Sequence, residues 1–155
     1  MSSDMNDTIN DPRIPDTTLP IWRSASAPFW EATRETKLIL QYSKKSGRFQ
    51  FYPRPLSIDT GTRDLEWREV SGHGEIFSFT NVRRSRGPLR GHEPFFIALV
   101  TLDEGVNVMA NIVNCSIESM KIGLRVRPHW HPLSNGMHLL MFEPDQDASG
   151  RAVAG

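Results

Sequence analysis

Two short segments with the same spacing of hydroxyl residues constrain the fold of this chain more than any other feature. Each has two hydroxyl residues separated by two positions and followed by a glycine: Ser43, Ser46 and Gly47, then Ser57, Thr60 and Gly61. Paired positions of this kind, each followed by a glycine at which the chain turns back, form the framework of a zinc ribbon. The spacing predicts two knuckles around a short aromatic-rich strand pair, over 38–41 and 49–52.

None of these four positions is a cysteine. Zinc in such a site is held by thiolates, whereas a serine or threonine hydroxyl stays protonated at neutral pH, so we expect no zinc here. A structural zinc site contributes on the order of 10 kcal/mol of apparent folding free energy, which something else must supply. We expect ordinary packing, rather than another metal, to supply it through Tyr42, Phe49, Phe51, Tyr52, Leu56, Ile58 and Trp67.

The length and charge of the chain limit the classes of protein to which it can belong. Its 155 residues suit one domain, or one domain with an appendage. The formal net charge of +0, from 18 basic and 18 acidic residues, argues against a general polyanion binder. The single cysteine, Cys115, excludes an intrachain disulfide and suits a reducing compartment. Without a membrane-length apolar run or a signal-peptide pattern, we expect a soluble cytoplasmic protein.

A short helix is expected before the first knuckle. Ser26 is a possible N-cap and Pro28 suits the first turn, so the helix would run to about Thr36. Phe29 and Trp30 form an aromatic pair that a helix this short cannot cover. Either the chain's own ribbon and barrel or another subunit would cover it.

The chain from Gly72 onward has the pattern of a β-barrel. Five strands are predicted over 75–82, 95–102, 106–113, 124–130 and 137–142. Phe77 and Phe79 are expected on one face of the first strand, and a helical turn over 117–122 between the third and fourth. This order matches an OB-fold, and residues 65–70 are expected to lead into it.

The predicted protein is therefore mainly β. Its parts are an N-terminal helical segment, a rubredoxin-like (zinc-ribbon-like but metal-free) hairpin module and a C-terminal five-stranded OB-fold barrel. The expected boundaries are a flexible tail over 1–19, the helical segment over 20–37, the degenerate ribbon over 38–69, the barrel over 70–144 and a second flexible tail over 145–155.

The loop between the first two barrel strands is rich in arginine. Guanidinium groups bind phosphates bidentately, and this loop of an OB-fold often contacts a ligand. Coenzyme A and nucleic acid both carry such phosphates, although a solvated hairpin tip is the simpler interpretation. The candidate phosphate-binding residues are Arg83, Arg84, Arg86 and Arg90.

No catalytic site is predicted. His129 and His131 share a strand face, but no third ligand completes a metal site. His73 lies between two glycines and is expected in a turn. Cys115 is expected to pack in the core because nothing in the sequence pairs it with a base.

Several short motifs occur along the chain in a fixed order: Phe29-Trp30, Leu40-Gln41, Tyr52-Pro53-Arg54, Trp67, Ser71-Gly72-His73-Gly74, Ser78-Phe79-Thr80 and Glu104-Gly105. In this respect residues 30–142 resemble a zinc-ribbon plus OB-fold family catalogued as domain of unknown function thirty-five. Family members have cysteines at four knuckle positions. The resemblance identifies the corresponding positions here as lost zinc ligands: Ser43, Ser46, Ser57 and Thr60.

This resemblance implies a non-catalytic accessory subunit that binds an acyl-CoA. It would dock on a thiolase-like acyltransferase or condensing enzyme, an aldolase or an acyl-CoA hydratase, and shape its substrate channel. A coenzyme A thioester is then the possible ligand, with no covalently bound cofactor and no zinc. The helix and ribbon would dock on the enzyme, with contacts from Phe29, Trp30, Phe49, Phe51 and Tyr52.

The alternative is an OB-fold module for single-stranded nucleic acid. Such modules stack bases on exposed aromatic side chains beside a basic groove, and Phe77 or Phe79 would serve. The balanced charge of the chain counts against this alternative, so nucleic acid is not an expected partner, and neither is a membrane.

Overall fold

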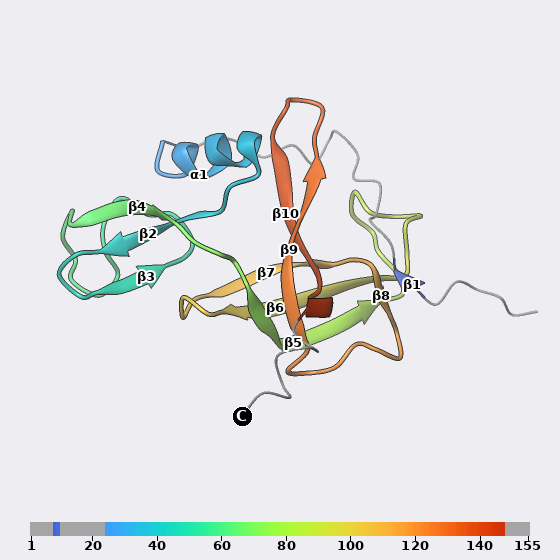
Figure 1. The fold of residues 1–155 in the computed structure, drawn as a ribbon. Coiled ribbons are helices and arrows are strands. Elements are labelled where there is room, and N and C mark those ends of the chain that lie inside the picture. Colours follow the sequence, from blue (N-terminus) through green and yellow to red (C-terminus); the bar gives the residue numbers. More distant parts are fainter. Residues whose placement is uncertain (1–7, 10–23, 148–155) are drawn as a thin grey trace, which may run out of the picture.

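A computed structural model describes residues 8–9 and 24–147 of the chain (Figure 1). The fold is mainly β, with one short α-helix within these residues and a closed five-stranded barrel, as predicted. The predicted flexible tails lie outside the described residues, apart from 8–9 and 145–147. The elements are β1 Thr8–Ile9, α1 Ala27–Ala32, a 3-10 turn Thr33–Glu35, β2 Ile39–Ser43, β3 Arg48–Gln50, β4 Leu65–Glu69, β5 Gly74–Val82, β6 Phe95–Leu102, β7 Asn107–Ile112, β8 Cys115–Ser116, β9 Arg125–Pro132 and β10 His138–Pro144.

The barrel closes in the strand order β10-β7-β6-β5-β9, which is that of the expected OB-fold. All neighbours are antiparallel except β10 and β7, which pair in parallel at Phe142 and Ile112. Alternate residues of β6 point into the barrel, so Phe96 and Val100 are buried while Leu99 is only partly covered. The apolar run of β6 thus fills the barrel core with one face and contributes a second, half-buried face outside it.

The segment between β7 and β9 contains the short helical turn that the sequence predicted: residues 117–119 form a turn in which the Met120 N–H donates to the Ser116 carbonyl at 3.2 Å. The backbone explains why this turn does not extend into a helix. Ile76 of β5 receives a hydrogen bond from the Gly123 N–H at 2.8 Å and donates one to the Leu124 carbonyl at 3.0 Å. The six residues between β8 and Gly123 must therefore cross to β5, which leaves too little chain for a stable helix.

A β-bulge in β5 separates Phe77 from Phe79, which the sequence predicted on one face of the strand. The register with β6 shifts between Ile76 and Ser78, so Phe79 pairs opposite the buried Ala98. Directly opposed residues point to the same side of a sheet, which puts Phe79 on the inner side at the barrel mouth, where its ring is 6.1 Å from that of Phe96. Phe77 remains 60% exposed, so the two phenylalanines do not share a face.

The ribbon module is a three-stranded sheet in the order β3-β2-β4. Residues 65–69 pair with β2 as its third strand, whereas the sequence suggested only a return to the barrel. The second strand ends at Gln50 instead of residue 52, because glutamine side chains hold the following loop. Gln41 Nε2 donates to the Arg54 carbonyl at 2.8 Å, and Gln50 Oε1 accepts from the Ile58 N–H at 2.9 Å.

Helix α1 lies beside the tip of the β9–β10 hairpin and next to the ribbon (Figure 1). Thr33, which is fully buried, makes the connection to the barrel. Its Oγ1 accepts a hydrogen bond from the His138 N–H at 3.2 Å, and its carbonyl is 2.8 Å from His138 Nδ1. Arg34 adds a 2.7 Å bond to the Asn135 carbonyl. These contacts fix the helix across the junction of ribbon and barrel.

We predict that Thr33→Val destabilises the protein by about 1–3 kcal/mol, because it leaves the partly buried His138 N–H without its acceptor. Urea unfolding followed by circular dichroism measures the change. Thr80→Val, on the exposed side of β5, is the matched control and should stay within about 0.5 kcal/mol of the parent chain. Equal stability of the two variants would contradict the assigned role of Thr33.

Candidate functional site

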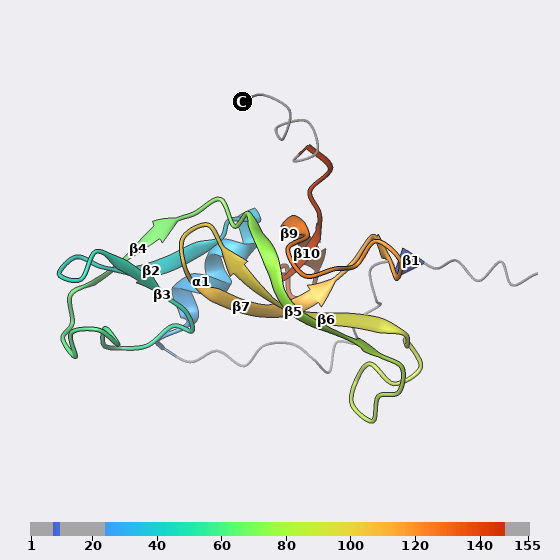
Figure 2. The same ribbon diagram turned by 90° about the horizontal axis from the view of Figure 1, so that it is seen from below.

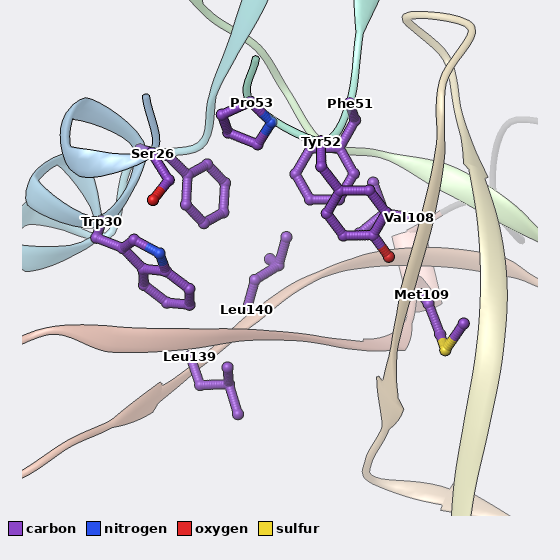
Figure 3. A pocket seen from close by; sticks show the side chains of 10 residues that line it. Ser26, Trp30, Phe51, Tyr52, Pro53, Val108, Met109, Leu139 and Leu140 are labelled. Carbon is purple, nitrogen blue, oxygen red and sulfur yellow. The ribbon is translucent and has the colours of Figure 1, made fainter. Parts of the chain in front are cut away.

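The helix, the ribbon and the barrel surround an apolar cavity of about 290 Å³ (Figure 3). Phe29 and Trp30 of α1 form one side with Ser26, and the segment after β3 contributes Phe51, Tyr52 and Pro53. The barrel provides the rest of the lining from two strands: Val108 and Met109 of β7, and Leu139 and Leu140 of β10.

Aromatic contacts hold the helix side of the cavity together. The rings of Phe29 and Trp30 meet edge to face at 5.1 Å, and Phe29 is 5.8 Å from Phe51. Phe51 in turn lies 4.3 Å from Tyr52, which is 53% exposed at the rim. Each such pair contributes about 0.5–1.5 kcal/mol beyond its buried area, so this wall is preformed.

Four of the five aromatic residues proposed for docking therefore meet at one site. The fifth, Phe49, does not line the cavity and packs on Tyr42 at a ring distance of 5.0 Å. Sequence reasoning missed the barrel side of the cavity. The alternation of β7 indicated that Met109 points away from the barrel interior, and it is 60% exposed, but only the position of α1 shows what it faces.

The lining contains no carboxylate, imidazole, amine or thiol. Its only side-chain polar groups belong to Ser26, Trp30 and Tyr52. A general acid–base or nucleophilic site needs a titratable group matched to its task and a partner that activates it. The cavity is therefore suited to binding an apolar group, at about 0.8 kcal/mol for each CH₂ removed from water, and not to chemistry.

The arginine loop joins β5 to β6 as predicted, and it lies at the opposite end of the barrel from the ribbon (Figures 1 and 2). All four arginines are exposed, and none forms an ion pair with another described residue or lines the cavity. The four residues are Arg83, Arg84, Arg86 and Arg90. The loop thus presents cationic groups that are available to an anion.

Glu93 braces this loop from within. Its carboxylate accepts the backbone N–H groups of Ser85 and Gly91, each at 2.6 Å. Hydrogen bonds from its own backbone N–H, from Ser85 and from Gly91, together with the charge of His92, lower the pKa of Glu93. The loop is consequently held in one shape although its side chains are exposed.

The knuckle residues meet around a carboxylate that sequence reasoning did not single out. Ser43 Oγ donates to Asp64 Oδ2 at 2.5 Å, and Thr60 Oγ1 donates to Asp64 Oδ1 at 2.7 Å. Bonds from Ser43 and Thr60, and from the Lys45 N–H and Thr62, hold the pKa of Asp64 well below its usual range. Among the residues that the structure describes, no group of three histidine, cysteine or acidic side chains is placed to hold a metal.

The aromatic and aliphatic packing that the sequence suggested is present at four of the seven positions: Tyr42 packs on Phe49, and Phe49, Phe51 and Trp67 pack against the core. The other three side chains are exposed. Tyr52 is 53% exposed, Leu56 is 42% exposed and Ile58 is 59% exposed. These side chains are too solvated to form a small core between the knuckles. The polar contacts to Asp64 occupy that place instead.

The candidate histidines and the cysteine make contacts that stabilise the fold. His129 Nδ1 is 3.3 Å from Glu143, whose carboxylate also binds Arg127 at 3.1 Å. Cys115 is 1% exposed and burial raises its thiol pKa, which confirms the expected packing role. His73 follows the positive-φ residue Gly72, and its Nδ1 is 3.0 Å from Asp145.

Comparison with known proteins identifies the family. Residues 67–131 match the family model described as ChsH2, C-terminal OB-fold domain. The DUF35 domain-containing scaffold protein of Pyrococcus furiosus is 30% identical over 98 residues, which are 63% of this chain and 72% of that protein. The chain belongs to the DUF35 family.

Two further similarities connect the fold to named enzymes. A chain of the Ltp2-ChsH2(DUF35) aldolase superposes with a TM-score of 0.73 at 25% identity, over 81% of this chain and 98% of that one. The probable enoyl-CoA hydratase alpha subunit of Thermomonospora curvata is 26% identical over 117 residues. Those residues are 75% of this chain and only 36% of that subunit.

None of the helices that the structure describes is long and apolar enough to cross a membrane.

We predict that Glu93→Gln loosens the arginine loop without unfolding the barrel. Amide exchange at Ser85 and Gly91 should accelerate, while exchange in β6 stays unchanged. The exposed Glu118→Gln is the control. The folded-state pKa of Glu93 lies below the unfolded value of about 4.3. The stability that comes from its bonds to Ser85 and Gly91 is therefore fully present above about pH 4.3 and is lost as the pH falls through the folded-state pKa. Equal exchange in the two variants would show that Glu93 does not brace the loop.

Proposed function

We propose that this chain is a non-catalytic accessory subunit of an enzyme that acts on acyl-CoA thioesters. The observation that carries the proposal is a preformed apolar cavity without an acid, a base or an activated nucleophile in its lining. Two similar proteins belong to enzymes, an aldolase and a probable enoyl-CoA hydratase. A subunit of this kind supplies binding surface, and its partner supplies the reacting groups.

In this proposal the chain docks on its partner enzyme through the aromatic surface at the cavity rim. The partner would be a thiolase-like acyltransferase or condensing enzyme, an aldolase or an acyl-CoA hydratase, whose substrate channel the subunit shapes. Tyr52 and Met109 are the most exposed apolar groups of the rim, at 53% and 60%. Aromatic side chains and methionine are enriched in protein interfaces, where a few of them carry most of the binding energy.

The thioester itself would extend from the cavity toward the arginine loop. Along β6, Leu99 pairs with Met109 of the cavity rim, and Phe95 pairs with Val82 at the base of the loop. Those two β6 residues are four positions apart, which is about 13 Å of strand. An acyl-CoA has an apolar group at one end and phosphates at the other, so one molecule would use both sites.

The OB-fold nucleic-acid module remains the second candidate, because of one specific observation. Phe77 is 60% exposed and Phe79 is 37% exposed on β5, the strand that leads into the arginine loop. Exposed aromatic rings beside guanidinium groups suit stacked bases. The net charge of +0 weighs against it.

Co-purification from the native cell tests the proposed function. We predict that the tagged chain isolates an acyl-CoA enzyme and that Trp30→Ala weakens this association by about tenfold or more. Phe49→Ala is the matched control, since Phe49 is an aromatic residue next to the cavity segment but outside its lining. Recovery of nucleic-acid enzymes instead, or equal loss with both variants, would overturn the assignment.

The arginine loop generates a kinetic prediction. Replacing Arg83, Arg84, Arg86 and Arg90 by alanine should raise the KM of the assembled enzyme for its thioester and leave kcat unchanged. Each lost charge-assisted bond costs about 1.5–3 kcal/mol at most, and less at an exposed site. A control chain with the same loss of charge replaces four exposed basic residues elsewhere: Lys44, Arg54, Arg63 and Lys121. Unchanged KM in the loop variant, or an equal rise in the control, would assign the loop to solubility alone.

A further inference from the structure

The two knuckles have the same kind of backbone turn, and neither contains a cysteine or a histidine. Gly47 has φ of +70° and Gly61 has φ of +67°. The N–H of each closes its turn by donating to the carbonyl four residues back, at 2.8 Å to Ser43 and at 2.9 Å to Ser57. A residue with a Cβ would be strained at either position. The first hydroxyl of each knuckle also accepts backbone N–H groups, from Ser46 at 3.1 Å in one knuckle.

The second knuckle repeats this arrangement. Ser57 Oγ accepts the N–H groups of Asp59 and Thr60, each at 3.3 Å. Both knuckles therefore fold their backbone around the oxygen of a side chain at their first position. In a zinc ribbon a shared metal ion links the two knuckles, so a chain without that ion needs another link between them.

Asp64 makes that link. Its Oδ2 accepts bonds from Ser43 Oγ at 2.5 Å and from the Lys45 N–H at 3.1 Å, both in the first knuckle. Its Oδ1 accepts bonds from Thr60 Oγ1 at 2.7 Å and from Thr62 Oγ1 at 2.8 Å, in and just after the second. Asp64 is 9% exposed and immediately precedes β4, so one residue ties both knuckles to the sheet.

We infer that the Asp64 carboxylate replaces the metal ion as the cross-link of this ribbon. An ionised carboxylate has about four acceptor sites, and four donors occupy them here. Hydrogen bonds to an ionised group are about twice as strong as neutral ones. The hydroxyls at two former ligand positions donate inward to the carboxylate, where thiolates would donate electron pairs to zinc.

Zinc does not fit the same residues. A structural zinc site needs four nitrogen, sulfur or carboxylate ligands, and residues 43–64 offer only two carboxylates, those of Asp59 and Asp64. The hydroxyl partners of Asp64 remain protonated at neutral pH, since they donate their hydrogens to it. Asp59, the nearest other acidic residue, faces Ser46 Oγ at 3.0 Å and Arg48 at 3.6 Å instead. The ribbon and the cavity wall attached to it are consequently insensitive to metal chelators and to thiol oxidants.

The first test compares two aspartates of the same module. Asp64→Asn keeps the shape of the side chain and removes its charge. Asp59→Asn is the comparison, because it removes the charge of a second-knuckle carboxylate that accepts one bond from the first knuckle, from Ser46 Oγ. Amide exchange at Lys45, Ser46 and Thr60 should accelerate about tenfold or more in Asp64→Asn and change little in Asp59→Asn, with β6 unaffected in both. Equal exchange in the two variants would overturn the inference.

Metal measurements on the unaltered chain complete this test. Elemental analysis after dialysis should find no stoichiometric zinc, and ribbon amide exchange should be the same with and without EDTA. About one zinc per chain, or faster ribbon exchange in EDTA, would overturn the inference regardless of how Asp64→Asn behaves.

A further experiment restores the cysteines and tests whether the Asp64 carboxylate occupies the position that a metal ion would take. A variant combines Asp64→Ala with cysteine at all four knuckle positions, Ser43→Cys, Ser46→Cys, Ser57→Cys and Thr60→Cys. It should bind about one Co²⁺ per chain with the absorption of a tetrahedral thiolate site, and zinc should displace the cobalt. If the variant has a folded barrel by circular dichroism but binds no cobalt, the carboxylate is not a substitute for the metal.

Discussion

The packing of α1 against both modules is the constraint on which the candidate site depends. Phe29 is 6% exposed, and its ring contacts Phe51 of the ribbon segment while its helix is tied to the β9–β10 hairpin through Thr33. Because the helix has only six residues, its own hydrogen bonds stabilise it little, and tertiary contacts must hold it. The cavity exists where these three parts meet, so its shape depends on the ribbon remaining folded.

The ribbon therefore has a structural task, which is to carry one wall of the cavity. A module of about thirty residues has too small a core to fold alone and usually needs a metal, disulfides or association. Here the hydrogen bonds of Asp64 connect the knuckles, while Gln41 and Gln50 hold the intervening loop. This loop carries Phe51 and Tyr52 to the cavity. A polar network thus positions the apolar lining of the cavity.

Much of the fold could be predicted from the sequence because it follows from local patterns. The five barrel strands predicted from the apolar pattern agree with the observed strands within a few residues. The bulge at Ile76 was missed because it is fixed by pairing with β6 and not by composition. The helical turn over 117–122 was expected from its residues, but its crossing to Ile76 depends on backbone pairing that the sequence does not show.

The candidate site was less predictable. Phe29, Trp30, Phe51 and Tyr52 could be chosen because exposed aromatic residues need a cover, but Phe49 met the same criterion and packs elsewhere. Leu139 and Leu140 gave no signal apart from being apolar strand residues. Asp64 lies after the second knuckle, outside the four positions whose spacing predicts the ribbon. An isolated acidic residue among hydroxyl-rich knuckles, in a chain without ligand cysteines, is the signal that would have found it.

The central claim is that the cavity binds the apolar part of an acyl-CoA without acting on it. Methyl NMR of Val108, Met109, Leu139 and Leu140 during titration with acyl-CoAs of increasing chain length tests this most directly, on the chain alone and bound to its co-purified partner. The account predicts that these methyl signals shift, that affinity rises with chain length, and that the chain alone leaves the thioester intact. Unperturbed methyl signals in both states, or turnover by the chain alone, would contradict it.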